Sequence, residues 1–145
     1  TMDSRLLIEN AVTPVREGCE DTTVLTELPS GEGVQLPASL LEAVRELVGN
    51  AADASEDATI AVELTYSEDG WVEVDVRDDG PGMPAMEADL LETGEETPLN
   101  HGQGLGLWMV RMVVTQAGGD VWVDSTTERT EICLRVPRAR WDRRS

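Results

Sequence analysis

The stretch IAVELTYSEDGWVEVDVRDDGPG, residues 60–82, has the pattern of a β-hairpin followed by a tight glycine-proline turn. Apolar and polar side chains alternate on both sides of residues 67–70, as expected for two antiparallel strands that bury one face. Strands buried on both faces would show continuous apolar runs instead. The sequence therefore predicts an α+β fold whose sheet has helices on one face and solvent on the other.

Two helix patterns flank this hairpin. Before it, Ser39 and Glu42 form a capping-box pattern ahead of an apolar stripe with helical spacing. After it, an apolar helix is predicted over residues 105–117. The glycine pair Gly118 and Gly119 is expected to end that helix.

Further strands and a third helix complete the predicted order. A short helix over residues 3–17 is expected to end or kink at Pro14, because proline cannot donate the helical hydrogen bond. The polar stretch 87–101 is predicted to be lid-like. Strand patterns occur at residues 22–28, 121–123 and 132–136.

Length, charge and composition narrow the function classes. The chain has 145 residues, the size of one domain, and a formal net charge of −18. This charge argues against nucleic acid and anionic membrane surfaces as partners. No apolar run is long enough to span a membrane. One histidine and two distant cysteines, Cys19 and Cys133, do not match zinc or disulfide scaffolds.

The basic residues are all arginine, since the sequence contains no lysine. A carboxylate-rich surface stays hydrated when molar salt shortens the Debye length to about 3 Å, whereas in dilute buffer its self-repulsion opposes folding. This composition is typical of a salt-adapted, haloarchaeal-type cytosolic protein. An acidic protein from a low-salt organism is the alternative.

One face of the capped helix carries side chains whose oxygen atoms could bind a metal ion. Glu46, Asn50 and Asp53 follow each other at helical spacing, so they project from one side, next to the apolar stripe. Mg²⁺ takes one or two such ligands and shares the phosphates of a nucleotide. A solvated helix face in an acidic protein is the alternative interpretation.

The end of the hairpin carries a carboxylate that the alternation directs inward. Counting by twos along the strand places Asp78 on the buried face, where an ionised group needs a hydrogen-bond donor. The exocyclic amino group of adenine is such a donor. Gly80 and Gly82 would let a ligand ring approach the backbone closely.

A third motif opens the last helix. Gly102, Gly104 and Gly106 present a loop without side chains, and the helix that follows directs its amides and its positive dipole end toward an anion. The spacing matches neither the dinucleotide-binding fingerprint nor a P-loop, which requires lysine. Alone, the motif is a weak indication of phosphate binding.

Together and in this order, the three motifs resemble the N, G1 and G2 boxes of the GHKL ATPase superfamily, which includes gyrase B, the heat-shock chaperone with a nucleotide-binding N domain, MutL and sensor histidine kinases. The resemblance covers residues 36–137 and is closest to the catalytic and ATP-binding domain of haloarchaeal sensor histidine kinases. It implies a Bergerat fold, a two-layer α/β sandwich with a mixed sheet. Residues 83–101 lack the phenylalanines usual in the lid of this family.

The resemblance also implies roles for individual residues. Glu46 would act as the general base or position the attacking group, Asn50 would coordinate Mg²⁺, and Asp78 would bind adenine. Independently of the resemblance, His101 and Arg111 lie near the third motif in the sequence and could lend positive charge to phosphate; for Arg111, an exposed helix residue is the alternative. The remaining residues implied in binding ATP are Asp53, Gly80, Gly82, Met83, Gly102, Gly104, Leu105, Gly106, Leu107 and Thr130.

The implied activity is phosphoryl transfer from ATP-Mg²⁺ to a histidine outside this chain, on a dimerisation segment of the same full-length protein, and then to a response regulator. Residues 1–17 would be the remnant of that upstream helical segment, 18–137 the ATP-binding domain and 138–145 a solvated tail. The expected location is the cytosol, as a free protein or as part of a membrane-bound sensor, without direct membrane contact. An anti-sigma-type serine kinase, a gyrase-like or MutL-like ATPase and a non-catalytic nucleotide sensor are the alternatives.

Overall fold

A mixed five-stranded sheet forms one layer of the computed structural model, which describes residues 1–67, 69–93, 105–126 and 128–138. The strand order is β2-β4-β5-β7-β6, with β2 parallel to β4 and the other neighbours antiparallel. A separate ladder pairs β1 with β3. The strands are β1 (Met2–Asp3), β2 (Thr23–Glu27), β3 (Gln35–Leu36), β4 (Thr59–Tyr66), β5 (Trp71–Asp78), β6 (Asp120–Ser125) and β7 (Thr130–Pro137).

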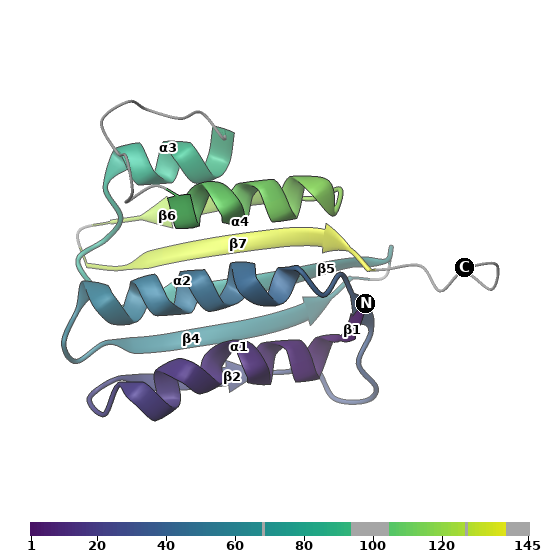
Figure 1. Cartoon of the computed structure of the whole chain (residues 1–145), viewed down its shortest axis with the longest axis horizontal. Coiled ribbons are helices and arrows are strands. Elements are labelled where there is room, and N and C mark those ends of the chain that lie inside the picture. The colour runs from purple at the N-terminus through teal and green to yellow at the C-terminus, as the bar shows by residue number, and fades with distance from the viewer. Residues whose placement is uncertain (68, 94–104, 127, 139–145) are drawn as a thin grey trace.

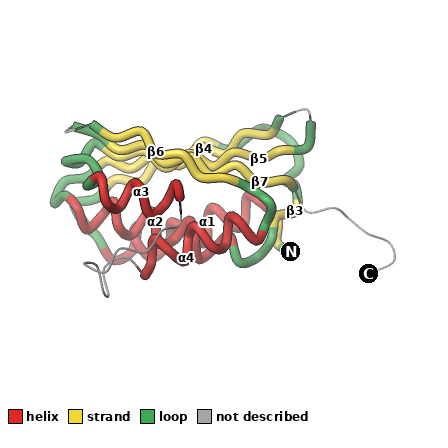
Figure 2. Tube along the Cα trace, turned by 90° about the horizontal axis from the view of Figure 1, so that it is seen from above, coloured by secondary structure: helices red, strands yellow, loops and turns green. Residues whose placement is uncertain are grey.

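Within the described residues, four helices form the second layer, all on the same face of the sheet (Figures 1 and 2). They are α1 (Ser4–Gly18), α2 (Leu40–Ala54), α3 (Ala85–Thr93) and α4 (Leu105–Gln116). The core lies between the two layers. None of the helices in the described ranges combines the length and the apolar character that a membrane span requires. The predicted α+β sandwich with one covered sheet face is confirmed.

The alternation in the hairpin sets which face of the sheet is covered. Val72, Val74 and Val76 of β5 are buried under the helices, whereas Glu73 and Asp75 lie on the opposite face. β4 and β7 show the same alternation of buried and less buried residues. The period of two in the sequence therefore correctly predicts one packed and one solvated face.

The first helix differs from its prediction because it continues through Pro14 to Gly18. Asp3 caps its start, since the carboxylate accepts hydrogen bonds from the amides of Arg5 and Leu6 at 3.0 and 3.2 Å. Its buried face, which includes the fully buried Leu7, packs against α2 and β2. Burial of this apolar face offsets the hydrogen bond that proline removes.

The second helix begins where predicted, but the expected capping box is wrong. Ser39 has helical backbone angles and its side chain caps no amide, while Glu42 pairs with Arg45 at 3.1 Å. The first amides of α2 instead donate to the carbonyls of Pro37 and Ala38 in short turns. The chain enters this helix through a tight turn, so the serine never takes the extended conformation that capping requires.

The last helix ends as its sequence predicts. The Gly119 amide donates to the Val114 carbonyl at 2.9 Å and the Gly118 amide to the Thr115 carbonyl at 3.0 Å, which is the Schellman pattern. Gly118 has a φ of 87°, in the left-handed region that favours glycine. The glycine pair therefore turns the chain directly into β6.

Both edge strands of the sheet receive a side chain from a helix. The Arg16 guanidinium of α1 donates to the Val24 carbonyl of β2 at 3.0 Å. At the other edge, the Val123 amide of β6 donates to the Glu92 carboxylate of α3 at 3.2 Å. Helix α3 itself was not predicted, because it occupies part of the polar stretch that was expected to be lid-like. The fully buried Leu91 anchors it to the core.

Candidate functional site

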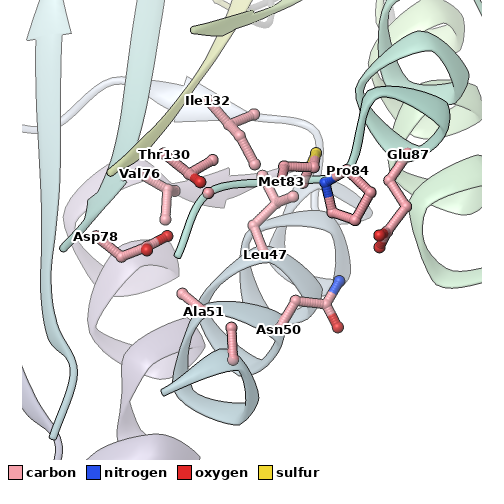
Figure 3. A pocket seen from close by; sticks show the side chains of 12 residues that line it. Leu47, Asn50, Ala51, Val76, Asp78, Met83, Pro84, Glu87, Thr130 and Ile132 are labelled. Carbon is pink, nitrogen blue, oxygen red and sulfur yellow. The ribbon is translucent and has the colours of Figure 1, made fainter. Parts of the chain in front are cut away.

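A pocket of about 140 Å³ opens between α2, the ends of β5 and β7, and the segment that leads into α3 (Figure 3). A cavity of about 150 Å³ accepts a ring the size of benzene. The pocket is therefore large enough to receive part of a planar aromatic ligand. Its lining residues are Leu47, Asn50, Ala51, Ala54, Val76, Asp78, Gly82, Met83, Pro84, Glu87, Thr130 and Ile132.

The walls of this pocket are apolar. Leu47 and Ala51 belong to the inward stripe of α2, and Val76 and Ile132 to the covered face of the sheet. Met83 lies beside them, on the segment that follows β5 (Figure 3). These side chains offer a flat ring two apolar surfaces and no competing hydrogen bonds.

One end of the pocket is polar, and it lies where β5 ends and β7 begins. Asp78 and Thr130 are direct cross-strand partners, and Thr130 is only 5% exposed. The Gly80 amide donates to one carboxylate oxygen of Asp78 at 2.9 Å. Burial raises the pKa of Asp78, the Gly80 hydrogen bond opposes this shift, and the charge of Asp79 adds to it. Asp78 is thus an inward acceptor, as the strand pattern predicted.

The opposite end carries Asn50 from α2 and Glu87 from α3 (Figure 3). The Asn50 amide offers an oxygen of the type that Mg²⁺ prefers. Glu87 was not among the predicted site residues, because it lies in the helix that the sequence analysis did not identify.

The loop between the two ends is held against the β6–β7 hairpin. Gly82 has a φ of 88°, and an added Cβ would overlap the Thr126 carbonyl. The Met83 amide donates to the Ser125 hydroxyl at 2.7 Å. Only glycine meets both the backbone angle and the close approach, so the second glycine of the motif at the end of the hairpin has a structural reason.

Helix α4 begins directly beside α2. A Cβ on Gly106 would overlap the carboxylate of Glu46, so these two residues lie in van der Waals contact. Glu46 does not line the pocket itself; it lies one helical turn before Asn50. The structure thus brings the first predicted motif and the start of the last helix together.

Other predicted site residues lie elsewhere. Asp53 is exposed and lines a separate groove near Cys19, and Leu107 is buried in the core. Gly80 contacts Asp78 but is not a lining residue. Arg111 is half-buried on α4 and does not line the pocket. His101, Gly102, Gly104 and the side chain of Leu105 lie outside the described part of the chain.

A second polar cluster lies on the uncovered face of the sheet. Glu73, Asp75 and Cys133 have potential ligand atoms within 4.8 Å of one another. Burial, followed by the hydrogen bond and charge of Asp75, raises the pKa of the Cys133 thiol to about 12. The thiol is therefore neutral near pH 7, which makes it a poor metal ligand and a poor nucleophile.

Comparison with known proteins gives a consistent family. Residues 35–140 match the family described as histidine kinase-, DNA gyrase B-, and HSP90-like ATPase. The chain is 28% identical over 134 residues to the adaptive-response sensory kinase SasA of Prochlorococcus marinus, covering 86% of this chain and 34% of that protein. It is 30% identical over 122 residues to the sensor histidine kinase DcuS of Escherichia coli, covering 81% and 22%.

Among solved structures, a mycobacterial sensor histidine kinase, MprB, superimposes with a TM-score of 0.76 and 27% identity, covering 97% of this chain and 99% of that one. The two curated relatives are much longer than this chain, which spans about a third of the first and less of the second. The match therefore concerns one domain of those proteins.

Proposed function

This chain belongs to the family of histidine kinase-, DNA gyrase B-, and HSP90-like ATPases, and from that premise we propose that it is the catalytic and ATP-binding part of a sensor histidine kinase. It would bind ATP with Mg²⁺ and donate the γ-phosphoryl group to a histidine outside residues 1–145. Its similarity to proteins named as sensor kinases supports this proposal over the gyrase-like and serine-kinase alternatives. Asp53, which the resemblance places among the ATP-binding residues, lies outside the pocket.

The main support for the proposal is that the Asp78 carboxylate faces into a pocket whose walls are apolar. Adenine would lie between the α2 side, at Ala51, and Met83, with its amino group donating to Asp78. The free oxygen of Asp78 suits this bond because the other oxygen already accepts from Gly80. The ribose and phosphates would then leave the pocket at the end where Asn50 lies (Figure 3).

The residues at that end fit a magnesium-bound phosphate chain. Asn50 would hold Mg²⁺, which neutralises phosphate charge and orients the transferred group when bound. Glu46, against Gly106 and one turn from Asn50, would accept the proton of the attacking imidazole or orient that ring. The start of α4 would direct its amides toward the phosphates. Catalysis would thus rest on positioning and charge neutralisation.

The acceptor histidine, the dimerisation segment that bears it and the response regulator are partners of the full-length protein in this proposal. Residues 1–17 would form the end of that segment and residues 138–145 a solvated tail. In that case the end of the segment would pack directly on the ATP-binding domain, since helix α1 contacts α2 and β2. We also propose a cytosolic location for the domain.

Calorimetry with ADP tests the pocket. Asp78→Asn should weaken ADP binding by about 1–3 kcal/mol, because an amide can present a donor where adenine needs an acceptor. Asp120→Asn, an exposed change at the start of β6, is the matched control and should bind normally. If Asp78→Asn and the unmodified chain bound ADP with equal affinity, adenine would not bind in this pocket as proposed. Phosphotransfer in the full-length protein then separates a kinase from a nucleotide sensor.

We further propose that the domain is adapted to high salt. The composition supports this: the net charge is −18 and lysine is absent. The ion pairs among the described residues are exposed or half-exposed arginine-carboxylate contacts, such as Arg129 with Asp124 at 3.3 Å. Such pairs contribute little in water, so they do not offset the repulsion among the carboxylates.

A further inference from the structure

Glu87 is a charged side chain of the pocket that has no role in the proposed function. It lies in the first turn of α3, at the end of the pocket opposite Asp78, together with Asn50 of α2 (Figure 3). Its side chain is half-buried, and within the described residues its carboxylate takes part in no hydrogen bond or ion pair. A carboxylate is an acceptor, and the described part of the protein supplies no donor to this one.

The fold fixes the place of Glu87 at the rim of the pocket. Its amide donates to the Pro84 carbonyl at 3.0 Å at the start of α3. The segment before Pro84 is held in turn, because the Met83 amide donates to Ser125 Oγ at 2.7 Å. Leu91, four residues further along α3, is fully buried. Side chains four residues apart share one face of a helix, so Glu87 lies on the inward face of α3.

The size of the pocket indicates which part of a nucleotide would reach Glu87. The pocket measures about 140 Å³, close to the cavity of about 150 Å³ that holds one benzene ring, so it can enclose a base but not the sugar as well. When the amino group of adenine is bound to Asp78, the sugar leaves the base on the opposite side. The ribose would therefore lie at the rim, between Glu87 and Asn50, and the phosphates would lie beyond it.

The chemistry of ATP leaves one direct partner for this carboxylate. The hydrogen-bond donors of ATP are the amino group of adenine and the 2′- and 3′-hydroxyls of ribose. The amino group is taken by Asp78 at the other end of the pocket. The phosphates are anionic acceptors, which repel a carboxylate. The two ribose hydroxyls are therefore the groups that Glu87 can bind directly.

We propose that Glu87 is a specificity-determining residue that accepts hydrogen bonds from the ribose hydroxyls, so that the domain selects ribonucleotides over nucleotides without these hydroxyls. The two oxygens of one carboxylate can serve two adjacent hydroxyls. The inference rests on the proposed function, since it requires adenine in the pocket with its amino group at Asp78. A magnesium ligand beside Asn50 is the competing role for Glu87, and the test separates the two.

The test is calorimetry in Mg²⁺-free buffer with ADP and 2′,3′-dideoxy-ADP, which lacks both hydroxyls. The unmodified chain should bind ADP about tenfold more tightly than the dideoxy ligand, the lower end of the range for a hydrogen bond to a charged group. Glu87→Ala should bind ADP about tenfold more weakly than the unmodified chain and should lose the preference. It should bind the dideoxy ligand at least as tightly as the unmodified chain does, because a negative charge near the phosphates has been removed.

Two further variants control for geometry and for charge. Glu87→Gln keeps the length of the side chain and one acceptor oxygen, so it should retain part of the preference for ADP. Glu32→Ala removes an exposed carboxylate that does not line the pocket, and it should keep the full preference.

Each competing role of Glu87 predicts a different result, and each of these results overturns the proposal. Tighter binding of ADP by Glu87→Ala would mean that the carboxylate only repels phosphate. Equal losses for ADP and the dideoxy ligand would mean that Glu87 only stabilises α3. A loss of affinity that appears only with ATP and Mg²⁺ would make Glu87 a metal ligand.

The unmodified chain separates this inference from the proposed function. If it binds ADP and the dideoxy ligand equally well, the selection by Glu87 is refuted and the proposed function stands. If it binds neither ligand, the proposed function is refuted as well.

Discussion

The contact between Gly106 and Glu46 allows catalysis to be separated from folding. In Gly106→Ala, the new methyl group would occupy the position of the Glu46 carboxylate. Because that carboxylate is the end of a flexible side chain, it can rotate away, at about 0.5–1.5 kcal/mol for an unfavourable rotamer. Replacing a helical glycine by alanine stabilises a helix by about 0.5–1 kcal/mol. The two effects oppose each other, so the free energy of unfolding should change by less than about 1 kcal/mol.

The consequences for activity should be much larger. A displaced Glu46 can no longer serve the attacking imidazole, and a general base contributes about 10²- to 10⁴-fold to a rate. Phosphotransfer by the full-length protein should therefore fall at least tenfold in Gly106→Ala, with a smaller loss of ADP affinity. Urea unfolding, calorimetry and transfer from labelled ATP measure the three quantities.

Gly49→Ala is the matched control. Gly49 is also a helical glycine, in α2 next to Asn50, but an added Cβ would meet nothing within 4 Å. This variant should gain the helical stabilisation and keep phosphotransfer. Normal phosphotransfer in Gly106→Ala would show that the position of Glu46 does not matter, which would refute its assignment as the base.

Three other measurements address the metal, pH and salt. Asn50→Ala should weaken the Mg²⁺-dependent part of ATP binding and leave Mg²⁺-free ADP binding nearly intact; equal losses in calorimetry would mean that Asn50 has a structural role. Burial raises the pKa of the Asp78 carboxyl, so the folded state binds the carboxyl proton more tightly than the unfolded state does. Ionisation of Asp78 therefore lowers the free energy of unfolding. This loss develops as the pH rises from the usual aspartate range through the raised pKa. Without nucleotide, Asp78→Asn should thus be more resistant to urea than the unmodified chain at pH 7 and lose this advantage near pH 3; no difference at pH 7 would contradict the burial. Finally, melting temperature and ATP affinity should rise from dilute buffer to about 2 M KCl, since screening removes the repulsion among carboxylates. A steady decline of both would exclude salt adaptation.

Local patterns predicted the parts of the fold that depend on local chemistry. The hairpin pattern gave the covered face of β5 because alternation needs no knowledge of the rest of the chain. The glycine pair after α4 predicted its end for the same reason. Both Asp78 and Asn50 line the pocket, and their direction could be predicted because each belongs to a regular element whose period sets it.

The missed features depend on tertiary contacts. Helix α1 continues past Pro14 because its apolar face is buried against α2 and the sheet, which the local sequence does not reveal. Ser39 does not cap α2, because the turn that precedes the helix satisfies its first amides instead. Ser125 came into the site through strand register, since it pairs with Thr130 across a hairpin. Such cross-strand placement cannot be read from one strand alone.

The two helix side chains at the sheet edges bear on how these molecules meet one another. An edge strand exposes amides and carbonyls that can pair with another chain and start aggregation. Arg16 occupies the carbonyl of Val24 on β2, and Glu92 occupies the amide of Val123 on β6. Molar salt that relieves repulsion inside one molecule also weakens the repulsion between molecules, so charge alone would stop protecting these edges. Each side chain occupies one backbone group that an added strand would need, and it does so by direct contact rather than by long-range repulsion.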